Sequence, residues 1–200
     1  MQTYSHFLIT AALYRIVPGS RRLPRKAVFW GSVTPDLPLI ALSLGSFVYF
    51  RLILDWAPRD LFRHIYGTLF YTDPFWIVSH NTLQAPLVLL TALTVLWKIH
   101  GRLHMLSSPW FGFFLSCLFH ATIDIFTHHN DGPLVFFPLD WTQRFFSPVS
   151  YWDRQYYGTQ FSRVEHLLDL LIVAWFILPM VCRRFFGGKQ PRSEAGSLVK

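Results

Sequence analysis

A histidine and an aspartate stand four residues apart within one apolar stretch of this 200-residue chain. His120 and Asp124 interrupt the run from Trp110 to Phe126, which otherwise lacks charged side chains. In a helix, residues four apart share one face, and His128 extends that face by another turn. Imidazole and carboxylate groups together ligate borderline divalent ions. The spacing therefore predicts part of a metal-binding shell, or alternatively an ion pair that neutralises itself inside a helical bundle.

Three more histidine and aspartate residues stand beside apolar stretches. His6 lies near the start of the chain, Asp36 follows Pro35 in a Gly-Ser-Val-Thr-Pro-Asp segment, and His80 precedes an apolar run. We expect the prolines to hold a rigid turn that leaves the Asp36 carboxylate at the mouth of a helix. Ionisable groups near or within apolar helices are costly and so point to function. The predicted ligands for one or two zinc-like ions are His6, Asp36, His80, His120, Asp124 and His128.

Four apolar stretches must position these side chains. Most are shorter than the roughly 20 residues that span a bilayer, but their aromatic and polar flanks can extend them. Pro58 to Tyr71 has the pattern of an amphipathic helix. We expect an all-α helical bundle, integral to a membrane, as one domain over residues 1–186, with a disordered polar tail over 187–200. The four stretches are Leu37–Leu54, Leu83–Trp97, Trp110–Phe126 and Leu167–Cys182.

Composition and charge favour a membrane protein over a soluble one. The chain is 52% hydrophobic and 14% charged, whereas a soluble domain carries about 25% charged residues. Its net charge of +7 comes from basic residues that flank apolar runs, five of them between residues 15 and 26. That placement orients membrane proteins rather than binding nucleic acid. We therefore expect a multi-pass protein of a bacterial-type inner membrane, with both termini cytoplasmic and no nucleic-acid partner.

The predicted ligands and a simple topology conflict. If four spans alternate strictly, Asp36 lies at the opposite side of the membrane from His80 and Asp124. Residues separated by about 30 Å of hydrocarbon cannot share a metal. Either the site omits His6 and Asp36, or residues 37–54 do not form a simple span. We favour the second alternative, in which all of these ligands meet at one end of the bundle.

The order of these motifs resembles the bacterial membrane-bound metal-dependent hydrolases. The matching positions are His6, Asp36, His80, His120 and Asp124, over roughly residues 3–140. The family is distantly similar to zinc-dependent phospholipase C, but Leu170 stands where the His-x-x-x-Glu helix of the phospholipase would place its glutamate. Glu165 and Asp169 are four residues apart and could serve instead.

The resemblance implies hydrolysis of a phosphoester or phospholipid by metal-activated water, with zinc as the expected ion. Asp36 or Asp124 would take the proton from that water or bridge two ions. The partner would be a membrane lipid, and the residues expected to bind a phosphate are Arg144, Arg154 and Arg163.

Two other functions fit the same residues. In a membrane scaffold or assembly protein the His and Asp pairs would be structural, and stoichiometric bound metal distinguishes this alternative from a hydrolase. In a small transporter, intramembrane His and Asp would mark a proton or metal pathway. Metal uptake into sealed vesicles would identify a transporter.

Overall fold

The fold is all-helical in the part of the chain that the structure describes. The computed structural model describes residues 1–186, except the side chains of 102, 103, 183, 185 and 186. A single bridge between Leu134 and Arg144 is the only β-type pairing in that part. The principal helices are α1 Thr3–Ile16, α2 Arg25–Val33, α3 Leu37–Ser46, α4 Pro58–His64, α5 Phe70–Thr72, α6 Pro74–Asn81, α7 Pro86–His104, α8 Pro109–Thr127 and α9 Gly158–Phe186. Short 3-10 turns cover Ser20–Arg22, Thr34–Asp36, Met105–Ser107 and Arg154–Tyr156, and π-helical turns cover Phe47–Ile53 and Ile65–Leu69.

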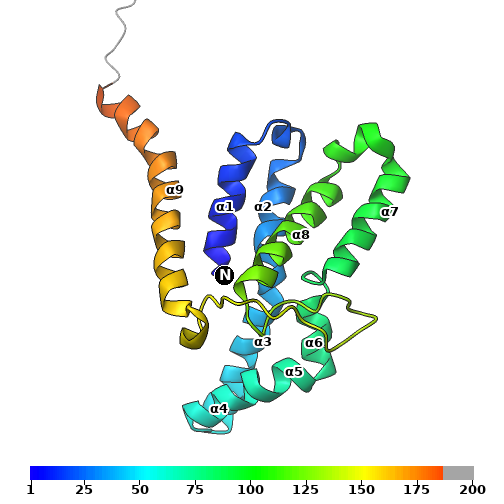
Figure 1. Ribbon diagram of the computed structural model, residues 1–200, viewed down its shortest axis with the longest axis vertical. Helices are drawn as coiled ribbons and strands as arrows, with labels where there is room; N and C mark the ends of the chain where they lie inside the picture. Colours follow the sequence, from blue (N-terminus) through cyan, green and yellow to red (C-terminus); the bar gives the residue numbers. More distant parts are fainter. Residues whose placement is uncertain (187–200) are drawn as a thin grey trace, which may run out of the picture.

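Five helices stand side by side and form a bundle. Neighbours contact one another in the order α9, α1, α2, α8, α7, and Figure 1 shows them in the upper half of the molecule, with α3 to α6 below. Part of the core lies between α7 and α8, where Leu89, Cys117 and Ala121 are fully buried. The expectation of a helical bundle is confirmed.

Asp36 lies within a long helix rather than at the mouth of one. The helical run continues from Arg25 to Ile53, 29 residues, because Pro35 and Pro38 fall in the first turns of successive segments. A proline there removes only an N–H group that would have no helical partner. The predicted tight turn is present as the 3-10 turn Thr34–Asp36, but it joins α2 to α3 within one helical run instead of opening a separate helix. Asp36 lies 11 residues, or about 16 Å, from the start of this run, so the helix reaches past the site in both directions.

Within the described part of the chain, three helices are long and apolar enough to cross a membrane: Arg25–Ile53, Pro109–Thr127 and Gly158–Cys182. The pair Pro74–Asn81 and Pro86–Gly101, bent by 46°, makes a fourth if it counts as one span. Many large apolar side chains on the outside of the bundle are exposed, including Leu167, Leu170, Leu171 and Leu178 on α9. An apolar exterior of this extent calls for a non-aqueous neighbour.

The chain start and the basic connection lie at opposite ends of α1. The basic residues between 15 and 26 occupy the end of α1, the link between α1 and α2, and the first turn of α2. The N-terminus, at the other end of α1, lies near the middle of the molecule in Figure 1. The C-terminal half of α9 reaches the same end as the basic link. The expectation that both ends of the chain share one side, with the basic link, does not fit this arrangement. That expectation counted residues 3–16, which form α1, as part of an N-terminal tail on one side of the membrane.

The amphipathic helix predicted over Pro58–Tyr71 is present. Helical turns follow one another from Pro58 to Thr72, and Leu61 and Ile65 are buried against Trp76 of α6. The tail predicted to be disordered, residues 187–200, lies outside the described residues.

Candidate metal centre

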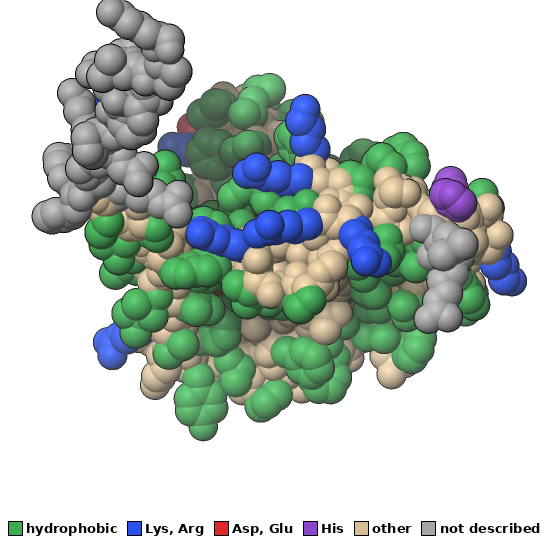
Figure 2. Space-filling model, turned by 90° about the horizontal axis from the view of Figure 1, so that it is seen from above, with side chains coloured by type: hydrophobic (Ala, Val, Ile, Leu, Met, Phe, Trp, Pro, Cys, Tyr) green, Lys and Arg blue, Asp and Glu red, His purple; other side chains and the backbone are tan. Residues whose placement is uncertain are grey.

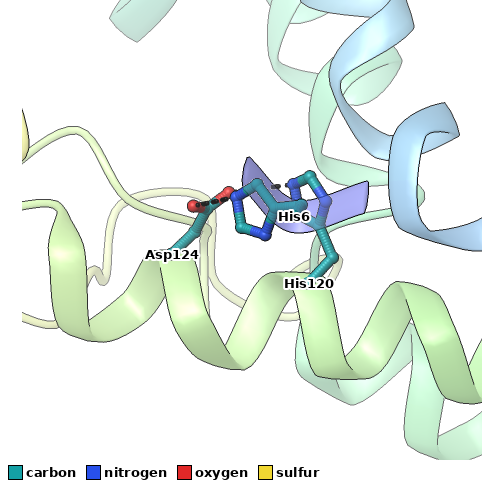
Figure 3. A group of neighbouring side chains, drawn as sticks. All are labelled: His6, His120 and Asp124. Carbon is teal, nitrogen blue, oxygen red and sulfur yellow. Dashed lines mark hydrogen bonds and ion pairs between the residues drawn. The ribbon is translucent and has the colours of Figure 1, made fainter. Parts of the chain in front are cut away.

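Three predicted ligands converge in the centre of the bundle. His6 comes from α1, while His120 and Asp124 come from successive turns of α8, and one ligand atom of each lies within 4.8 Å of the other two. Figure 3 shows the three side chains pointing toward one another. All three are buried. A group of two imidazoles and one carboxylate at this spacing could hold a metal ion.

A close crossing of α2 over α8 fixes the orientation of His120. Gly31 faces α8 so closely that a Cβ there would overlap the backbone oxygen of Phe113 and approach Ser116 Cβ to 2.9 Å. The next residue, Ser32, presents its carbonyl oxygen 2.9 Å from His120 Nδ1. Since a carbonyl oxygen only accepts, Nδ1 carries a proton, and in the neutral ring Nε2 is then the nitrogen that can ligate a metal. A metal-ligating histidine in proteins is commonly anchored in this way.

The Nε2 atom of His120 faces two carboxylates. It lies 3.0 Å from Asp124 Oδ2 and 3.2 Å from Asp36 Oδ1, yet this buried atom has no partner in hydrogen-bond geometry among the described residues. A lone pair directed at two anionic oxygens is repulsive unless a proton or a metal ion lies between them. The donor set therefore suits a divalent cation or, without one, an imidazolium paired with both carboxylates.

His6 completes the group from a different helix. Its Nε2 lies 2.9 Å from Asp124 Oδ1, and its ring stacks on His120 with centroids 3.7 Å apart and planes inclined by 14°. Neither ring can rotate freely in this stack, because both side chains are buried. Asp124 thus contacts one imidazole with each carboxylate oxygen.

Asp36 is oriented by two residues that the sequence did not single out. Thr3 Oγ1 donates to Asp36 Oδ2 at 2.6 Å, and Gln84 Nε2 donates to Asp36 Oδ1 at 3.3 Å. Gln84 also reaches the carbonyl oxygen of Pro35 at 3.3 Å. A threonine and a glutamine have no spacing signature of their own, so only the fold reveals this role.

The remaining predicted histidine ligands line an adjoining pocket of about 160 Å³, together with Asp36 and Asp124. His80 Nδ1 donates to the carbonyl oxygen of Trp76 at 3.0 Å, which leaves Nε2 as the acceptor nitrogen. His128 Nε2 lies 3.4 Å from Asp124 Oδ1 and 2.9 Å from the amino group of Met1. The structure therefore brings all six predicted ligands to one region.

Two further residues of the pocket come from the loop after α8. Burial alone would raise the pKa of Asp131, but the neighbouring His128 imidazole and a 2.7 Å hydrogen bond from Trp152 Nε1 outweigh it, so that the pKa is lowered and the carboxylate stays charged. Burial raises the pKa of Tyr151, which keeps the phenol neutral as a hydrogen-bond donor. No motif or spacing in the sequence identifies Tyr151 as a pocket residue.

The three arginines expected to bind phosphate differ in position. Arg144 is half-buried, donates through Nη1 to the carbonyl oxygen of Gly132, and lies over the rings of Phe70 and Tyr71 at 5.1 and 5.5 Å. Phe70 lines the pocket, so this guanidinium lies beside it. Arg154 and Arg163 are exposed, outside the residues that line the pocket.

Glu165 and Asp169, the alternative ligands on α9, hold the start of α1 instead. Glu165 Oε1 accepts from the backbone N–H of Gln2 at 2.8 Å, and Asp169 Oδ2 accepts from Ser5 Oγ at 2.7 Å. Both carboxylates are buried. They fix the turn of α1 that carries His6, next to Ser5.

No family model, no curated protein and no solved structure matches the chain.

Proposed function

We propose that this protein is a membrane-embedded, metal-dependent hydrolase acting on a phosphoester, and that a phospholipid is its substrate. The observation that carries the proposal is the buried group His6, His120 and Asp124, with His120 Nε2 also facing the Asp36 carboxylate at 3.2 Å. It stands at the edge of a pocket lined by further histidine and aspartate residues.

His6, His120 and Asp124 would hold the ion, and Asp36 and His128 flank them. A bound divalent ion such as zinc supplies Lewis acidity, which lowers the pKa of water and polarises a phosphoryl group.

The protein's own residues would orient the reactants. Asp36 is held by Thr3 and Gln84 at the wall of the pocket, in reach of a water molecule whose proton it would accept. Tyr151 contributes a neutral phenol to the same pocket. Arg144 lies beside this pocket and would donate hydrogen bonds to the phosphate. In this scheme the Asp36 carboxylate acts as the base, and Tyr151 and Arg144 hold the phosphate by hydrogen bonds.

The apolar exterior and the basic connection suggest how the protein lies in a bilayer. The link between α1 and α2 is at the basic end of the bundle (Figure 2), and His6 is at the other end of α1. Positive charge stays on the cytoplasmic side of membrane proteins. The site would then lie away from the cytoplasmic face, about 13 Å along α1 from Arg15.

The first test is the metal content of detergent-purified protein, measured for the wild type and for His120→Ala and Asp124→Ala. Matched controls are His104→Ala and Asp60→Ala, which remove an exposed histidine and an exposed aspartate elsewhere. We expect at least one tightly held ion per chain in the wild type and in both controls, and its loss in both site variants. Absence of metal from folded wild type, even after metal is added back, would contradict the proposal.

The second test separates catalysis from a structural metal. Metal-loaded protein is offered phospholipids in mixed micelles and a soluble phosphodiester, with Asp36→Asn as the variant expected to keep its fold and lose turnover. Hydrolysis that depends on Asp36 supports the proposal. Bound metal without hydrolysis of either substrate would favour the scaffold function.

A further inference from the structure

A second hollow lies between α1, α2 and α9 and shares no lining residue with the pocket beside the candidate metal centre. Its volume is about 530 Å³, within the range of small-molecule ligand pockets. The walls are apolar and come from all three helices: Phe7, Leu8, Ala11, Phe29, Val173 and Ile177. Such a groove on the outside of an apolar bundle suits a hydrocarbon chain.

Three arginines line the same groove. Arg15 ends α1, Arg21 lies in the link, and Arg25 begins α2. None of them forms an ion pair with a carboxylate among the described residues, and no acidic residue belongs to the lining. Basic side chains gather at this end of the molecule in Figure 2. The groove therefore combines apolar walls with an uncompensated positive charge.

Aromatic rings hold two of these guanidinium groups in place. Arg15 lies 4.6 Å from the ring centre of Trp175 and 5.3 Å from that of Phe176, and Arg25 lies 5.4 Å from that of Phe29. A guanidinium that stacks by its face keeps the N–H donors at its edge available. Those edges can bind the oxygens of a phosphate in paired hydrogen bonds.

We propose that this groove binds an anionic phospholipid, with an acyl chain against the apolar walls and the phosphate at the three arginines. Basic pockets between membrane helices on the cytoplasmic side recognise lipid head groups in this way. Arg15 follows His6 by nine residues, about 13 Å along α1, so this lipid would be a bound ligand separate from any substrate of the metal centre. The proposal does not depend on hydrolase activity.

The test counts lipids bound to detergent-solubilised full-length protein by native mass spectrometry. Phosphatidylglycerol, phosphatidylcholine and glycerol phosphate are each titrated onto wild type, onto the triple variant Arg15→Gln, Arg21→Gln, Arg25→Gln, and onto the single variant Arg21→Gln. The charge-matched control is Arg59→Gln, Arg63→Gln, Arg154→Gln, which removes three exposed arginines outside this groove.

We expect the wild type and the control to prefer phosphatidylglycerol over phosphatidylcholine. Each arginine lost should weaken phosphatidylglycerol binding about five-fold, and the triple change roughly 100-fold. Ala11→Phe, which fills the groove, should also weaken binding, whereas Val95→Phe on the exposed face of α7 should not. Equal phosphatidylglycerol binding by wild type and Arg21→Gln would overturn the proposal. Displacement of phosphatidylglycerol by an equal concentration of glycerol phosphate would also overturn it, because the acyl chain of the lipid would then contribute nothing to binding.

Discussion

At the scale of single residues, the two nitrogens of His120 have separate functions. Nδ1 is committed to the Ser32 carbonyl oxygen, and Nε2 is thereby directed at the carboxylates of Asp36 and Asp124. Asp36 in turn is fixed by the hydroxyl of Thr3. Residues that orient metal ligands affect the affinity for the metal almost as strongly as the ligands do.

We predict that Thr3→Val weakens metal binding about 10-fold, because the Asp36 carboxylate beside the ion would attract it less when it is no longer held in place, and loss of an orienting hydrogen bond at a metal site costs 10- to 100-fold in affinity. The measurement is competition with a chelator of known affinity. Thr122→Val is the matched control, because the Thr122 hydroxyl bonds only a carbonyl of its own helix, at Leu118. Equal affinities for Thr3→Val and wild type would show that Asp36 is not oriented through Thr3.

At the scale of elements, the site depends on how closely α2 crosses α8. Gly31 permits this approach, because any side chain there would meet the backbone of Phe113. The approach brings Ser32 to His120 and, one turn further along the same helical run, Asp36 to the centre. Small residues commonly allow such close helix packing in membranes.

Gly31→Ala is expected to destabilise the protein by about 1–3 kcal/mol through overpacking and to reduce metal content. Gly45→Ala is the control in the same helical run, since a Cβ there meets nothing within 4 Å. That change should be neutral or stabilise by up to about 1 kcal/mol. Thermal unfolding in detergent measures both. Similar melting temperatures for the two variants would contradict a tight α2–α8 crossing.

The loop between α8 and α9 also contains a testable element. Asp140 Oδ1 accepts from the N–H and hydroxyl of Thr142 at 2.7 and 2.8 Å and from the N–H of Gln143 at 2.9 Å. This turn reverses the chain, so that Val135 N–H donates to Gln143 O at 3.2 Å and Arg144 pairs with Leu134. Asp140 therefore helps to place Arg144 beside the pocket.

The hydrogen bonds from Thr142 and Gln143 lower the pKa of Asp140 below its ordinary value. A carboxyl group with a lowered folded pKa stabilises the turn above its unfolded pKa of about 3.9, and this contribution is lost as the pH falls through the folded value. We expect Asp140→Ala to increase hydrogen exchange of residues 138–146 at neutral pH. Wild-type exchange, corrected for intrinsic rates, should approach that of the variant only below about pH 4. Convergence at pH 6 would refute this assignment.

At the scale of the whole molecule, the basic connection and the exposed loop lie at different ends. The link between α1 and α2 is at one end of the bundle, and the chain between α8 and α9 crosses the other end (Figure 1). Exposed apolar side chains lie on the helices between them, for example Leu90 and Val95 on α7 and Leu170 and Leu171 on α9. In a membrane these two connections should be on opposite sides.

We predict that Arg22→Cys and Leu139→Cys react with a membrane-impermeant maleimide from opposite sides of sealed vesicles, in a Cys182→Ser background. Both positions are exposed, Leu139 by 83%, and the second native cysteine, Cys117, is buried. Only Arg22→Cys should react from the cytoplasmic side. Labelling of both from one side would exclude the membrane arrangement proposed for the site.

The local pattern of the sequence determined the nature of the site but not its assembly. His120 and Asp124 share a face because a helix repeats every 3.6 residues, and their apolar surroundings follow from the residues between them. The helices and the amphipathic segment were predictable for the same reason. Thr3, Gln84 and Tyr151 were not, because an isolated polar residue carries no periodic signal.

What only the tertiary structure decided is the convergence of His6, Asp36 and α8. Sequence reasoning began the second helix at Leu37, which put Asp36 at a membrane face, whereas the helical run starts at Arg25 and carries Asp36 into the bundle. The crossing at Gly31 then sets the distance between α2 and α8, and the carboxylates of α9 hold α1 beside them. These are contacts between residues remote in sequence, and close packing rather than local periodicity determines them.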